Sequence, residues 1–465
     1  MRHYNTRPIY QEPTPGSSVV MLGLIISFIV MAGLIASWLG VTLVGLAEQD
    51  RLITVYTGDI LSAIPIATGL YALGAVIAMR FPLRQAVGWY SLFFSIRILT
   101  AIVLSYTFMY DDEKAFHYAA LDLPERFGYL GAGRAYYSLV TWVYSSFGAN
   151  IIIPKTVNTL FGSLLPFLAL AIATKLPIAR IYALQAFWII GLAPPFIVFS
   201  AVNLKETLTS FVILLVAWSL VLSRNRPIAA LVTTSLGVGG LYWVRGAPFA
   251  LAGMLGMVVR YFWPFSRNPR RIQWWSFGAV LALAGILFFG QKLLGSISAT
   301  IVSRTTREEY FVRRFTESQA TVNRFLSVDS PLSPKNIVIL FLRGLYSPSP
   351  LRCLLDSSVE TLTEAASMAL WYLLFPLSLI TLFRFWRSPE IVALWTIGFM
   401  VFAMATAGVA VGSDPFRHRI TVFGLFAVLA SMSMNYKIVR KYSWVSWLWG
   451  IGAVAFTVLW LRFRF

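Results

Sequence analysis

The chain has 465 residues, of which 58% are hydrophobic and 12% are charged, and its mean hydropathy is +0.72. Soluble domains contain about 45–50% apolar residues, so this composition excludes an ordinary soluble protein. The net charge of +19 is better explained by basic inner loops of a membrane protein than by nucleic-acid binding. The one cysteine, Cys353, excludes an intramolecular disulfide and argues against a cysteine metal cluster.

Apolar runs that are long enough to cross a bilayer as helices recur along the whole chain. The first is too long for a signal-peptide core, so we interpret it as a retained span. The runs predict an all-α integral membrane protein, a polytopic helix bundle of about thirteen transmembrane helices, at about residues 18–46, 58–79, 87–109, 150–174, 180–200, 206–223, 227–244, 248–264, 274–291, 366–385, 390–411, 418–434 and 443–462.

Basic residues alternate between successive loops. With the N-terminus inside, the inner loops hold clusters of Lys and Arg and only Glu12 and Glu390 as acidic residues. The short outer loops hold few basic residues, so the positive-inside rule favours this orientation. We expect an inner (cytoplasmic) bacterial membrane, with the acidic face extracytoplasmic.

Two outer segments are long, at about 110–149 and 292–365. The second is basic and is interrupted by Ser/Pro-rich turns. We therefore expect four regions, which are a tail with two added spans (1–87), a core with the first outer loop (88–291), the basic segment (292–365) and the last spans (366–465). No clear internal repeat is visible, which argues against a transporter built on duplicated halves.

An acidic cluster, Asp111-Asp112-Glu113, follows directly on the third span. A carboxylate beside a like charge can accept a proton from an attacking hydroxyl. Paired carboxylates can also hold a divalent metal. His117 lies four residues beyond Glu113 and would share its helix face, so Asp112, Glu113 and His117 are candidate metal ligands. The alternative is that these acids simply end a span on the outside.

Charged residues at four further places suggest an anion site. Arg97 lies near the middle of a span, where a charge needs a partner or a wet cavity. Lys205 opposes the dipole of the helix that Glu206 begins, so a bound anion would explain it, whereas Glu206 is accounted for as a first-turn acid. Arg245 begins a short outer turn, and a later turn carries three basic residues, Arg417, His418 and Arg419.

Arginine forks bind phosphate bidentately, and several basic turns on the carboxylate face suggest an anion beneath them. Each such residue is otherwise a snorkelling helix cap. The sequence contains no Walker G-x-x-x-x-G-K-[ST], no H-E-x-x-H and no G-x-S-x-G motif, which argues against an ATPase of that kind and two hydrolase classes.

With these positions assembled, the chain resembles the GT-C glycosyltransferase superfamily, and most closely its protein mannosyltransferase and aminoarabinose transferase branch. The resemblance rests on the acidic motif 111–113, the Lys205-Glu206 pair and the basic turn 416–419, and it covers most of residues 88–435 in pattern. The chain departs from many members by having two spans before the acidic loop.

The resemblance implies a polyprenyl-phosphate-linked sugar donor and a lipid, glycan or protein acceptor. It implies that Asp111 or Asp112 is the base, with Glu113 in the same catalytic motif. Arg97, Lys205, Arg245, Arg417 or Arg419 would neutralise the donor phosphate, and Glu206, His117 and His418 would line the site. It leaves a divalent metal open.

Three rival functions stay open. A polysaccharide polymerase or ligase would use a lipid-pyrophosphate glycan and depend on basic residues of the second outer segment, such as Arg313, Arg314 and Arg324. A lipid-linked sugar flippase or other transporter would need more intramembrane charges than Arg97. A non-catalytic scaffold leaves the outer charge clusters without a reason.

Overall fold

In a computed structural model, the described residues are 57–81, 83–107, 111–122, 134–176, 180–222, 227–262, 342, 345–346, 359–408 and 415–464. All regular secondary structure in these residues is helical. The helices are α2 (Thr57–Ala78), α3 (Ala86–Thr107), α4 (Asp111–Asp122), α5 (Arg134–Phe147), α6 (Ile152–Ala173), α7 (Arg180–Leu192), α8 (Pro194–Ala201), α9 (Glu206–Leu222), α10 (Pro227–Arg245), α11 (Ala247–Phe262), α15 (Val359–Phe385), α16 (Pro389–Gly408), α17 (Pro415–Ser431), α18 (Tyr436–Lys441) and α19 (Ser443–Arg464).

Within the described residues, five helices are long and apolar enough to cross a membrane, namely α2, α3, α6, α10 and α15, and the bent pair α7–α8 would make a sixth. Shorter apolar helices accompany them. These helices coincide with the predicted spans from 58–79 onward. The predicted spans 18–46 and 274–291 and most of the segment 292–365 lie outside the described residues, so the total of thirteen spans stays a prediction.

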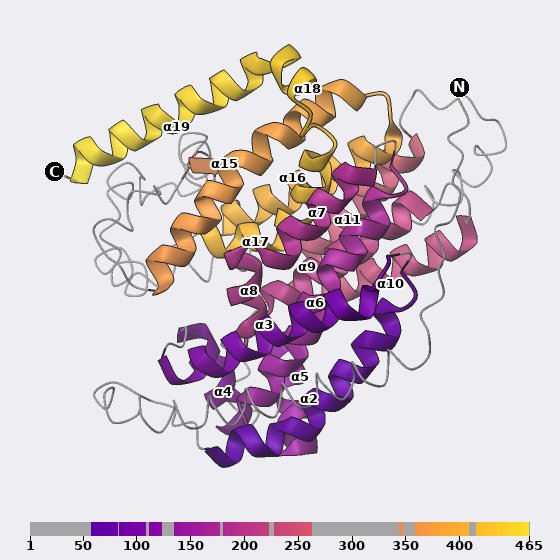
Figure 1. Ribbon diagram of the computed structural model, residues 1–465. Coiled ribbons are helices and arrows are strands. Elements are labelled where there is room, and N and C mark those ends of the chain that lie inside the picture. Colours follow the sequence, from indigo (N-terminus) through magenta and orange to yellow (C-terminus); the bar gives the residue numbers. More distant parts are fainter. Residues whose placement is uncertain are drawn as a thin grey trace.

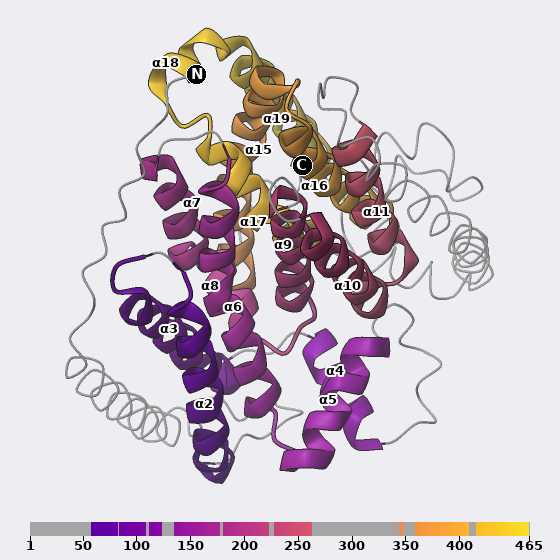
Figure 2. The same ribbon diagram turned by 90° about the vertical axis from the view of Figure 1, so that its right-hand side faces the viewer.

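Helix α6 is the centre of the bundle. Its candidate span is 83% buried, against 33% for those of α2 and α10. It packs against α2, α3, α7 and α9, which surround it in Figure 2. Its polar side chains, among them Thr156, Asn158 and Ser163, are buried. Polar groups on a spanning helix are costly in lipid, so this burial explains why α6 takes the central place.

Helix α9 connects two ends of the bundle that carry different ion pairs. Glu206 starts α9, and the Leu220 carbonyl near its other end accepts a hydrogen bond from Arg260 Nε at 3.2 Å. At about 1.5 Å per residue, these positions are about 21 Å apart. Arg260 Nη2 also pairs with Glu390 Oε1 at 3.0 Å. The orientation expected from sequence assigns Arg260 and Glu390 to the same face, and the structure joins them.

The segments of the first outer loop form helices at one end of the molecule. Figure 1 shows α4 and α5 together with α2 at that end, and α18 at the opposite end. Helices α4 and α5 pack against each other. The acidic motif therefore begins a short helix that lies against the end of the bundle.

The span expected over 180–200 is two helices rather than one. Helix α7 ends at Leu192, α8 begins at Pro194, and the pair is bent by 47°. Ala193 between them is extended, with φ −65° and ψ 132°. Prolines 194 and 195 lack the N–H that would continue α7, and proline is well suited to the first positions of a new helix. The apolar pattern alone does not reveal this break.

Candidate functional site

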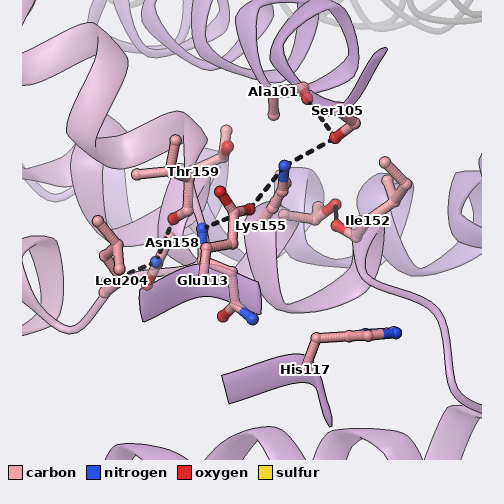
Figure 3. A network of polar contacts seen from close by, with 12 residues as sticks. Ala101, Ser105, Glu113, His117, Ile152, Lys155, Asn158, Thr159 and Leu204 are labelled. Carbon is pink, nitrogen blue, oxygen red and sulfur yellow. Dashed lines mark hydrogen bonds and ion pairs between the residues drawn. The ribbon is translucent and has the colours of Figure 1, made fainter. Parts of the chain in front are cut away.

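The acidic motif begins helix α4. Asp111 and Asp112 are its first two residues, and their side chains lie outside the described part of the structure. Glu113 is 0% exposed, and its Oε1 lies 2.7 Å from Lys155 Nζ on α6. Lys155 Nζ also donates to Ser105 Oγ on α3 at 2.8 Å (Figure 3). A fully buried ion pair therefore fastens the first turn of α4 to two spanning helices.

Glu113 also binds the turn that precedes α9. The backbone N–H of Asn203 donates to Glu113 Oε1 at 3.2 Å. This contact joins residues that are 90 positions apart in sequence. The acidic motif and the Lys205-Glu206 pair are thus brought to the same place, although the loop of α4 and the turn before α9 belong to different parts of the chain.

Buried amides fix the shape of this turn. Asn158 Nδ2 on α6 donates to the carbonyls of Val202 at 2.7 Å and Leu204 at 2.8 Å. The Tyr136 hydroxyl on α5 donates to Asn203 Oδ1 at 2.7 Å and lies 2.9 Å from Asn158 Nδ2. These contacts satisfy backbone carbonyls outside a helix, which would otherwise be costly to bury. The turn 202–205 is held from α4, α5 and α6 at once.

A second buried ion pair lies at the start of α9. Glu206 Oε1 accepts from Arg245 Nη2 at 2.8 Å, and Arg245 Nε donates to Thr209 Oγ1 at 3.1 Å. Glu206 is the first residue of α9 and Arg245 the last of α10, so both charges also suit the helix dipoles. Gly246 follows with φ +85°, the left-handed conformation common just after a helix.

Lys205 lies between these two ion pairs. Its side chain is half-buried, and its Nζ is 6.0 Å from the centre of the Phe116 ring on α4. That distance allows a cation–π contact. The predicted anion ligand Lys205 therefore sits where α4 meets the start of α9.

The basic residues 416–419, which the sequence predicted as a turn, are helical and form the start of α17, and α17 packs against α9. Ser210 Oγ, in the second turn of α9, donates to the Ile420 carbonyl at 2.9 Å. Arg419 is 0% exposed, contacts Met368 Sδ and lies over the Trp371 ring at 5.8 Å. Arg417 and His418 belong to the first turn of α17, and their side chains lie outside the described part of the structure.

His117 has a defined partner on α5. Its Nδ1 lies 2.7 Å from the Tyr144 hydroxyl. Burial lowers the pKa of His117, the nearby Lys155 lowers it further, and Asp59 opposes both by raising it. Burial also raises the pKa of Tyr144. The neutral imidazole is therefore favoured, paired with a neutral phenol.

The metal-ligand prediction for Asp112, Glu113 and His117 stays untested. Among the side chains that the structure describes, no group of three or more His, Cys, Asp or Glu lies together. Glu113 and His117 contact protein groups, as above. Glu113 Oε1 is paired with Lys155 Nζ, so the contacts of this oxygen are those of a structural ion pair.

Arg97 lies deep in the bundle at the α7–α8 break. It is 0% exposed. Its Nη1 donates to the carbonyls of Phe93 at 3.2 Å and Gly191 at 3.1 Å, and its Nη2 donates to Ile190 at 3.1 Å. Substrate binding by Arg97 stays a prediction, but both terminal nitrogens are engaged by backbone carbonyls.

Sequence reasoning missed the residues that hold the motifs together. These are Lys155, Asn158, Asn203 and Tyr136. Lys155 lies within the predicted span 150–174, directly after four apolar residues. A charge in such a span is itself a sign of a functional or pairing role, so this signal was available. The asparagines and Tyr136 carry no comparable signal.

No protein-family model matches the chain, and no curated protein matches it. Among solved structures, the chain is similar to the archaeal oligosaccharyltransferase AglB from Archaeoglobus fulgidus in complex with an inhibitory peptide and a dolichol-phosphate, at 15% identity and a TM-score of 0.35. The match covers 85% of this chain and 55% of that chain, so the chain spans about half the length of AglB. A similarity at this TM-score carries no argument, so the functional case rests on the site itself.

Proposed function

We propose that the chain is a membrane glycosyltransferase that moves a sugar from a polyprenyl-phosphate donor to a lipid, glycan or protein acceptor on the extracytoplasmic face. The observation that supports this most is the convergence of three separate motifs at the start of α9. Glu113 accepts from the turn before α9, Lys205 lies against α4, and Ser210 binds the Ile420 carbonyl beside Arg419.

The roles follow from how these groups are engaged. Glu113 is neutralised by Lys155, so its contacts suit a positioning role better than proton transfer. Asp111 or Asp112, in the same helical turn, is then the base that takes the proton from the acceptor hydroxyl. A positioned general base contributes about 10²–10⁴-fold to a rate. Lys205, with Arg417 and Arg419 from the basic turn, would stabilise the phosphate.

The proposed step is a direct displacement. The acceptor oxygen forms a bond to the anomeric carbon as the bond from that carbon to the phosphate oxygen breaks. The hydroxyl proton goes to the Asp carboxylate, and polyprenyl phosphate leaves with the bonding electrons. Attack in line with the leaving group inverts the anomeric centre.

The test compares Asp111→Asn and Asp112→Asn with wild type in cells. Extracted polyprenyl-linked sugars and surface glycans are analysed by mass spectrometry. Transfer should fall about 10²–10⁴-fold in at least one variant, with accumulation of one polyprenyl-monophosphate sugar and loss of one glycan residue. Glu390→Gln, which removes a carboxylate at the opposite end of α9, is the matched control and should transfer normally.

Two results would decide against this function. Full transfer by both Asn variants would remove the carboxylates from catalysis. Accumulation of whole repeat units on pyrophosphate would indicate a polymerase or ligase that uses a lipid-pyrophosphate glycan.

A further inference from the structure

Two consecutive prolines remove two backbone donors from the end of α7. In an α-helix, the N–H of residue i donates to the carbonyl of residue i−4. Residues 194 and 195 would therefore serve Ile190 and Gly191. Both are prolines and have no N–H. Two buried carbonyls in the middle of the bundle are left without their helical partners, and an unsatisfied carbonyl at this depth is costly.

Arg97 supplies donors to the same two carbonyls. Its Nη2 binds Ile190 O and its Nη1 binds Gly191 O, each at 3.1 Å. We propose that Arg97 is a positioning residue that replaces the two missing backbone donors and thereby holds the α7–α8 break. This also explains why a charge is retained in the middle of a span, because the planar guanidinium presents two parallel donors that lysine cannot.

Two glycines make room for this arrangement. A Cβ on Gly191 would lie 2.4 Å from Phe93, one turn before Arg97 on α3. A Cβ on Gly162 of α6 would lie 2.2 Å from Ser200 and 3.3 Å from Arg97 Nε. Because Gly191 has no side chain, the end of α7 can lie against Phe93 of α3, and Gly162 in the same way lets α6 lie against Ser200 of α8. The α7–α8 break is therefore packed against both α3 and α6.

The break directs α8 toward the candidate site. Helix α8 ends at Ala201, and the turn 202–205 that binds Glu113 and Asn158 follows at once. Thr207 Oγ1 donates back to the Phe199 carbonyl at 2.7 Å, which ties the start of α9 to α8. A change in the bend angle would move this turn away from α4. Holding the break does not depend on the proposed function, whereas the effect on sugar transfer does.

A double-mutant cycle tests this role. The purified full chain is compared in lipid nanodiscs as wild type, Arg97→Met, Pro194→Ala/Pro195→Ala and the triple variant, with Tm as the readout. The alanines restore the missing N–H groups, so Arg97→Met should lower Tm at least about twice as much in the wild-type background as in the alanine background. Equal losses in both backgrounds would overturn the proposal.

A second pair of variants with smaller changes, Pro195→Ala and Arg97→Lys, tests the same role if the double alanine variant does not fold. Pro195→Ala alone returns one donor, to Gly191, and Arg97→Lys retains a charge but loses the fork. Pro195→Ala should recover part of the Tm lost by Arg97→Lys. No recovery would contradict the proposal.

Sugar transfer by the same variants separates positioning from phosphate binding. If Arg97 acts through the break, the triple variant should transfer within a few-fold of Pro194→Ala/Pro195→Ala. A triple variant that is stable but inactive beside an active alanine pair would overturn the positioning role in favour of a donor-phosphate contact. Failure of the proposed function itself would show separately, as normal transfer by the Asp111→Asn and Asp112→Asn variants.

Discussion

The two ends of α9 are both joined to neighbouring helices by ion pairs, but they differ in how many buried polar groups surround them. At one end, an ion pair between Arg260 and Glu390 joins two of the described helices, and Glu390 is 16% exposed. At the other end, Glu113–Lys155 and Glu206–Arg245 are both nearly or fully buried, and the amide of Asn158 holds the turn before α9. The additional buried groups therefore favour a functional site at the start of α9.

The largest expected effect is that of Lys155→Met. It leaves the Glu113 carboxylate buried without its counter-charge, and breaking such a pair costs about 3–5 kcal/mol. We expect a large loss of Tm in nanodiscs, measured by intrinsic fluorescence, and a corresponding loss of transfer.

A companion variant shows whether the charge or the shape matters in this pair. Glu113→Gln/Lys155→Met removes both charges and should recover most of the stability, because the uncompensated charge is gone. A double variant as unstable as Lys155→Met would mean that the pair is not the source of the effect.

Glu206→Gln should have a smaller effect at the same end. Arg245 keeps Thr209 Oγ1 and the Phe249 ring, 5.6 Å away, and the Gln amide can still accept a hydrogen bond. The loss of a charge-assisted bond is worth about 2 kcal/mol. Denaturation of the purified variant would measure it, with Glu206→Ala as a more severe comparison. A neutral outcome would place Glu206 outside the network that holds α9.

Glu390→Gln changes the ion pair at the opposite end of α9 and tests whether that end matters less for stability and transfer. Because Glu390 is partly exposed and its partner Arg260 also donates to the Leu220 carbonyl, we expect a cost of about 1 kcal/mol or less. Transfer should be unchanged. A loss of stability as large as that of Glu206→Gln, or a loss of transfer, would mean that the two ends of α9 do not differ.

The smallest expected effect depends on pH. The folded pKa of His117 is lowered, chiefly by burial, so the unfolded state binds the proton more readily. The stability that this contributes is fully present above the unfolded pKa of about 6.5 and is lost as the pH falls toward the folded pKa. The charged groups that influence the pKa of His117 are Asp59, which raises it, and Lys155, which lowers it. His117→Gln should make Tm less sensitive to acid between about pH 7.5 and pH 5.5, and an unchanged pH profile would contradict this.

Much of the helical architecture could be predicted from apolar runs. Except for 18–46 and 274–291, which lie outside the described residues, the predicted spans coincide with described helices, because long apolar segments in a membrane have few alternatives to helix. The break in 180–200 was not predicted because apolarity does not distinguish one helix from two. The Pro194-Pro195 pair carried that information, since each proline removes one donor.

The site was predictable in part. The sequence singled out Glu113, Lys205, Glu206 and Arg245, and the structure brings them to one end of α9. It could not show that Lys155 neutralises Glu113, because the pairing joins separate helices. Arg97 was correctly expected to need a partner, but the partner is a pair of carbonyls that become available through prolines about 100 positions away. A local sequence pattern does not predict a hydrogen bond between a side chain and backbone carbonyls of a distant helix.

The central position of α6 bears on how the chain is assembled in the membrane. Its Lys155, in the first turn of α6, is a charge within a candidate span and would be costly to insert alone. Its partners Ser105 and Glu113 are synthesised earlier, so they are available when α6 leaves the translocon. The acceptors of Asn158, at 202 and 204, emerge later. The order of synthesis thus allows Lys155 to pair with Glu113 first. The Asn158 amide binds the carbonyls of the turn before α9 later, when the following helices have been inserted.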